Sequence, residues 1–66
     1  MIKRFKLEKI NWKKGLRFMY WTFYQQNGTS WLESDEGDYL KVHDYDHALE
    51  IMKYQEKFGW KYELIS

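Results

Sequence analysis

The chain has 66 residues, of which 21% are aromatic and 32% charged, and its formal net charge is +1 at pH 7. This length predicts one small domain, residues 1–66, near the lower limit for a chain that folds around its own core. Cysteine is absent, which excludes disulfide bonds and thiolate metal sites. The first residues are charged and the longest apolar-aromatic run is short, so we expect a cytoplasmic protein with no signal peptide and no membrane partner.

Residues 3–10 are the first predicted strand, leading into a sheet. Their apolar positions fit neither a clean period of two nor a long helical stripe. A single helical turn over residues 8–13 is the alternative prediction for this segment.

From Leu16 the pattern is clearly that of a strand, with large side chains alternating between two faces up to Tyr24. Asn27 and Gly28 then supply the two positive-φ residues of a type I′ turn, which predicts a two-residue β-hairpin. This loop length places Tyr24 opposite Trp31 and Thr22 opposite Glu33.

The acidic segment over residues 34–38 is a second predicted turn, followed by a short strand over residues 39–43. Asp44 is suited to be a helix N-cap, and Gly59 lies where a helix C-terminal glycine is expected. Between them, apolar residues gather on one side of the helical wheel. Residues 60–65 alternate again and predict a last strand.

The predicted fold is therefore α+β: a small, mostly antiparallel sheet of about four strands with one helix packed on one face, in the order strand, hairpin, strand, helix, strand. One helix covers only one face of a sheet. Fourteen aromatic residues are too many for the interior of so small a domain. Some aromatic rings must therefore line an open face, although the pattern does not decide which face of residues 16–26 is buried.

We take the open face as the partner-binding site. Met19, Trp21 and Phe23 are the expected anchors, with Arg17 and Trp31 at the edge. Tryptophan and tyrosine with nearby arginine are the usual anchors of binding surfaces.

Charge is split along the chain. Residues 1–17 contain seven basic side chains and one acidic one, and residues 33–50 contain seven acidic side chains and one basic one. Such segregation can orient a partner. The alternative is that the two blocks lie side by side in the fold and neutralise each other.

No catalytic, cofactor or metal site is expected. His43 and His47 are four residues apart, but His43 precedes the predicted helix, which weakens the case for a shared metal. The acidic turn lacks the later glutamate of a calcium-binding EF-hand loop. No serine has a recognisable nucleophile context, and no glycine-rich phosphate loop is present.

The segment "YDHALEIMKYQEKFGWKYELI" resembles the ending of very small bacteriophage proteins, in which an Asp-x-Ala-Leu helix start leads through a glycine into a terminal strand. The layout is similar to that of the T7-type inhibitor of host RNA polymerase. This resemblance implies a phage-encoded protein that occupies a surface of a host protein. It carries no residue roles to this chain.

The leading hypothesis is a non-enzymatic binding protein that inhibits or redirects a host protein. An alternative is a single-stranded nucleic-acid-binding module that uses the basic N-terminal third, with Trp12, Lys13, Lys14 and Arg17 as contacts. The overall charge of only +1 argues against that alternative. A homodimer that buries the open face is the third hypothesis.

Overall fold

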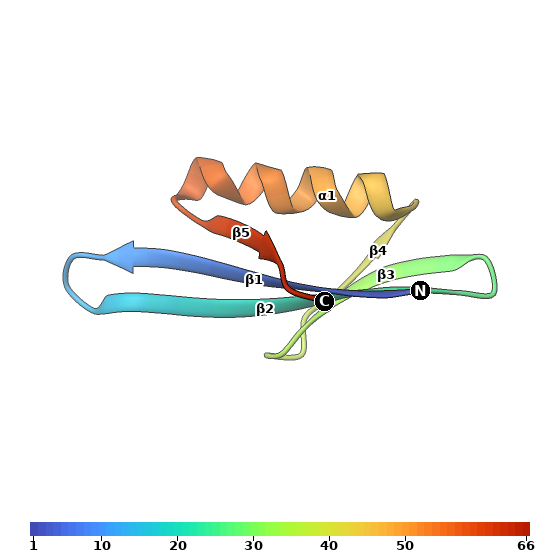
Figure 1. Cartoon of the computed structure of the whole chain (residues 1–66), viewed down its shortest axis with the longest axis horizontal. Helices are drawn as coiled ribbons and strands as arrows, with labels where there is room; N and C mark the ends of the chain where they lie inside the picture. The colour runs from blue at the N-terminus through green and yellow to red at the C-terminus, as the bar shows by residue number, and fades with distance from the viewer.

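The computed structural model describes all residues, Met1–Ser66, and forms one antiparallel sheet with a helix on one side (Figure 1). The sheet has five strands in the order β4-β3-β2-β1-β5. The α+β prediction is confirmed, but the expected number of about four strands is wrong. The strands are β1 (Ile2–Asn11), β2 (Gly15–Gln26), β3 (Thr29–Ser34), β4 (Tyr39–Val42) and β5 (Lys61–Leu64).

The first four strands form a continuous antiparallel meander. β1 pairs with β2 from Ile2 opposite Tyr24 to Asn11 opposite Gly15. The predicted strand in this region is confirmed, and the alternative of a helical turn over residues 8–13 is wrong. Asn27 and Gly28 have φ angles of 52° and 77°, as the predicted type I′ turn requires.

The cross-strand register of the second hairpin also confirms the prediction. Tyr24 lies opposite Trp31, and Thr22 lies opposite Glu33. The two-residue turn sets this register, because any other loop length would shift every pair along the strands.

The helix α1 (Tyr45–Tyr54) continues into a short 3₁₀ turn, η1 (Gln55–Phe58). The Asp44 side chain accepts a hydrogen bond from the backbone N–H of His47 at 2.8 Å, which confirms the predicted N-cap. Gly59 ends the 3₁₀ turn with φ 90°, a left-handed conformation that glycine adopts without strain. The helix is short, and it is not long and apolar enough to cross a membrane.

The core lies between α1 and the sheet. Phe23 is fully buried, and its ring meets that of Tyr45 edge-on, with the centroids 5.2 Å apart. The buried hydrophobic residues come from four strands and the helix: Phe5, Leu7, Phe23, Leu32, Val42, Ala48 and Met52.

The strand register decides which face of β2 the helix covers. Phe5 lies opposite Trp21 and Leu7 lies opposite Met19, so both β2 side chains share the face of the buried β1 residues. Trp21 and Met19 are partly buried and pack against the core, and the Trp21 Nε1–H contacts Met19 Sδ at 3.1 Å. The prediction that Met19, Trp21 and Phe23 lie on the open face is therefore wrong.

The molecule is elongated, with principal extents of 43 × 20 × 19 Å. β5 pairs with β1 only between Phe5 and Glu8, and β3 pairs with β2 only from Trp21 onward. Residues 9–17 therefore pair only with each other, and we call this two-stranded segment the hairpin arm. In Figure 1 the β1–β2 hairpin extends past the end of the helix.

Replacing Phe23 by alanine is expected to lower the free energy of unfolding by about 3–5 kcal/mol, because it empties the centre of the core. A chain of this size has a total stability of roughly 3–10 kcal/mol, so this variant should lose a large part of it and unfold at a much lower urea concentration. The matched control is Phe18→Ala on the same strand, whose side chain is 47% exposed and should cost less than about 1 kcal/mol. Urea unfolding followed by circular dichroism measures both changes, and equal midpoints would contradict the assignment of the buried face.

Candidate functional site

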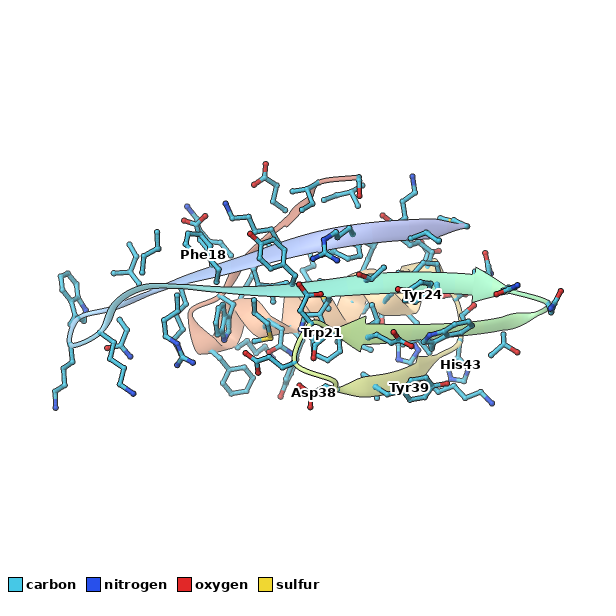
Figure 2. All side chains as sticks on the ribbon, turned by 90° about the horizontal axis from the view of Figure 1, so that it is seen from below. Phe18, Trp21, Tyr24, Asp38, Tyr39 and His43 are labelled. Carbon is cyan, nitrogen blue, oxygen red and sulfur yellow. The ribbon has the colours of Figure 1, made fainter.

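The face of the sheet opposite the helix carries a group of aromatic side chains (Figure 2). We call this group the aromatic platform. Its members occupy alternating positions on three neighbouring strands, which puts them on the face opposite Phe23 and Leu32. They are Phe18, Tyr20 and Tyr24 from β2, Trp31 from β3 and Tyr39 from β4.

Tyr24 and Trp31 form the ordered centre of the platform. Their rings are stacked, with centroids 5.2 Å apart and planes at 17°. The indole Nε1–H of Trp31 donates to Glu33 Oε1 at 3.1 Å, which fixes the ring along its own strand. The two rings therefore present a preformed apolar surface rather than two independent side chains.

Arg4 ties three parts of the open face together. Its guanidinium donates to Thr22 Oγ1 at 3.0 Å and to Asp35 Oδ2 at 2.7 Å, and it lies 5.0 Å from the centroid of the Tyr20 ring. The Arg4–Asp35 contact is the single salt bridge of the structure. One ion pair therefore joins the basic and acidic blocks of the sequence. The structure does not contain the series of ion pairs across the sheet that general neutralisation of the two blocks would require.

The remaining charged residues on this face include both basic and acidic side chains. Lys6 lies over the Phe18 ring at 4.7 Å from its centroid. Across the β1–β5 pair, Lys6 is opposite Glu63 and Glu8 is opposite Lys61. The open face thus combines aromatic rings with alternating charges rather than with an excess of one sign.

The hairpin arm is a second, separate surface. Trp12 at its apex is 97% exposed, and Lys13, Lys14 and Arg17 are exposed beside it. Asn11 Oδ1 accepts hydrogen bonds from the backbone N–H groups of Lys13 and Lys14, at 2.9 and 3.2 Å, so the turn has a defined conformation. The four residues proposed for nucleic-acid contact are therefore close together on one protruding element.

Of the residues expected at the partner site, only Trp31 is part of the aromatic platform. Arg17 belongs to the hairpin arm and shares the face of Phe23. Sequence reasoning left the other four platform residues, Phe18, Tyr20, Tyr24 and Tyr39, out of this site. The sequence of β1 contained the information needed to find them. Arg4 and Lys6 alternate there with the apolar Phe5 and Leu7, which indicates that the face of the two basic residues stays exposed to solvent.

The two histidines and the acidic turn have structural explanations. His43 and His47 stack with centroids 4.9 Å apart, and the backbone N–H of His43 donates to His47 Nδ1 at 3.0 Å. In the acidic turn, Ser34 Oγ accepts from the backbone N–H groups of Glu36 and Asp38. No group of three or more histidine or acidic side chains is arranged to hold a metal ion.

The Arg4 contacts give a test of the geometry of the open face. Removing either Arg4 or Asp35 should lower stability, and a double-mutant cycle between Arg4→Ala and Asp35→Ala should give a coupling of about 0.5–1 kcal/mol, since both side chains are partly exposed. The cycle between Lys41→Ala and Asp35→Ala is the control, because Lys41 has no salt bridge. Unfolding in urea measures both cycles, and zero coupling for Arg4–Asp35 would show that the contact is absent in solution.

The chain was compared with models of known protein families, with curated proteins and with solved structures, and none of them matches it.

Proposed function

We propose that the chain is a non-enzymatic binding protein that docks a partner protein on the aromatic platform. The observation that carries this proposal is the arrangement of five aromatic side chains on a sheet face that no element of the fold covers. Exposed aromatic side chains gathered on one face of a small domain are typical of an interaction site.

The platform has the anatomy of a protein interface. Its centre is the stacked pair Tyr24–Trp31, which is half-buried and held in place, so little side-chain entropy is lost when a partner covers it. Phe18 and Tyr39 extend the surface on either side and are 47% and 60% exposed. Aromatic residues at the centre with polar residues at the rim are the usual composition of such interfaces.

The cations of this face favour a protein partner over a nucleic acid. Arg4 is already bound to Asp35 and Thr22, and Lys6 lies over the Phe18 ring. Phosphate groups need an excess of free cations, whereas these two are engaged within the domain. The other lysines of this face, Lys41 and Lys61, share it with the acidic side chains of Glu8, Glu33 and Glu63. The platform therefore offers rings and balanced charges, which suit a protein surface of mixed polarity.

The resemblance to small bacteriophage proteins supports a narrower form of the proposal. In that form the partner is a host protein, the site of action is the host cytoplasm, and occupation of the platform inhibits or redirects the partner. The segregation of charge along the chain would then set the orientation of the complex.

The test is a pull-down from host or source lysate with nuclease present, using the tagged wild-type chain and the double variant Tyr24→Ala/Trp31→Ala. We expect one stoichiometric protein to be captured by the wild type and to be lost with the double variant. In titrations with that purified protein, affinity should fall at least about 30-fold, the range of hot-spot residues. The double variant should still fold, because a cross-strand aromatic pair contributes only about 0.2–1 kcal/mol.

The matched control is Tyr54→Ala/Phe58→Ala, which removes two exposed aromatic rings from the helical side. Equal loss of capture in both double variants would contradict the assignment of the platform. If the wild type captures only itself, and light scattering shows a dimer that the platform variant breaks, the face is a homodimer interface and the proposal of a different partner fails.

A further inference from the structure

We propose that the hairpin arm binds single-stranded nucleic acid, with Trp12 stacking on a base and with Lys13, Lys14 and Arg17 contacting phosphates. This activity is separate from the proposed docking of a protein on the aromatic platform. It uses a different element and different side chains.

The arm is free to enter a partner. Residues 9–17 pair only with each other, because the neighbouring strands stop at Glu8 on one side and Trp21 on the other. Every residue from Trp12 to Phe18 is exposed. A strand of nucleic acid could therefore contact the apex without any rearrangement of the fold.

Trp12 has no structural role that would account for its position. Its side chain is 97% exposed, and it takes part in none of the aromatic or cation–π contacts of the structure. Each of the other three tryptophans either makes such a contact or packs on the core. An indole ring left in water forgoes a large burial energy. A single-stranded base offers such a ring a flat partner of matching size.

The cations of the apex are also free. Residues 9–17 contain four basic side chains and no acidic one, and the single salt bridge of the structure lies elsewhere. Lys9 is directed to the Trp60 ring at 5.6 Å from its centroid, which leaves Lys13, Lys14 and Arg17 for phosphates. This is the opposite of the platform, where Arg4 and Lys6 are engaged.

The acidic block of the sequence does not oppose phosphate at the apex. The acidic turn meets β2 where the backbone N–H of Asp35 donates to Tyr20. Tyr20 is five residues from Gly15, which is about 17 Å along a strand. The Debye length at physiological salt is about 8 Å, so the acidic turn is screened from the apex.

A nucleic acid fits the apex better than a lipid bilayer does. Ile10 and Leu16 are 69% and 50% exposed and form a cross-strand pair, which alone would suit a membrane interface. They lie below the apex, however, and the leading residues of the arm are Trp12, Lys13 and Lys14. A bilayer would have to admit the two lysine ammonium groups before it reached the apolar pair.

The experiment is fluorescence anisotropy with a labelled single-stranded oligonucleotide of about 16 nucleotides, the upper end of the site sizes of small single-strand-binding folds. With three phosphate contacts, the plot of log affinity against log salt concentration should have a slope of about −2. Affinity should therefore fall about 20-fold between roughly 50 and 200 mM salt.

Two variants separate the roles of ring and charge. Trp12→Ala should weaken binding by about 5-fold to 150-fold and leave the salt slope unchanged, because stacking releases no counterions. Lys13→Ala/Lys14→Ala should reduce the slope to about −0.7. Urea midpoints of both variants should match that of the wild type, since all three side chains are exposed.

The matched charge control is Lys53→Ala/Lys57→Ala on the helical side, which removes two exposed lysines and should leave the slope near −2. Equal effects of the two lysine pairs would overturn the proposal, because binding would then follow net charge alone. Equal affinity for the same sequence as a duplex would overturn the stacking of Trp12 on an unpaired base.

An anionic vesicle of phosphatidylglycerol is the competing probe. Sedimentation of the chain with these vesicles, together with no anisotropy change on the oligonucleotide, would overturn the proposal in favour of a membrane-surface role. Because Tyr24→Ala/Trp31→Ala leaves the arm intact, its oligonucleotide binding should equal that of the wild type, and failure of the platform proposal would not affect this result.

Discussion

The arrangement of the whole molecule depends on a mismatch of length between its one helix and its longest strand. The ten residues of α1 span about 15 Å, whereas the twelve residues of β2 span about 40 Å. The helix can therefore cover one face of the sheet, and only its middle. The buried cluster around Phe5, Phe23 and Met52 occupies that covered region. The sheet face without a helix and the protruding end of the first hairpin are both uncovered because the single helix is much shorter than the longest strand.

These two uncovered regions differ in how their charges are used. On the open face, Arg4 is bound by Asp35 and Thr22 and lies against Tyr20, so the charge serves to hold strands and rings in place. On the hairpin arm, Lys13 and Lys14 contribute only their backbone N–H groups to the turn, and their side chains remain available. A formal charge near zero thus conceals two surfaces with different chemistry. The summed charge of the chain is a poor guide to either of them.

Local signals in the sequence were sufficient for most of the fold. The Asn27-Gly28 turn set the register of the second hairpin, and Asp44 set the start of the helix, because both act over a few residues. The buried face of β2 was not decided, since that strand has large side chains on both sides. Its orientation depends on pairing with β1, where a face containing Arg4 and Lys6 is costly to bury. The hairpin arm was equally hidden, because its isolation depends on where β3 and β5 stop, which is a property of the assembled sheet.

The free edges of the hairpin arm have a consequence for how copies of the chain meet. The outer strands of the sheet, β4 and β5, have only four residues each, and such short edges discourage strand pairing between molecules. The arm, by contrast, exposes unpaired backbone groups along both of its strands, and its lysine and arginine side chains would repel those of a second arm. A polyanion would cancel that repulsion. Neighbouring copies on one nucleic-acid strand could then join arm to arm through backbone hydrogen bonds, so that binding of the first copy would favour binding of the next.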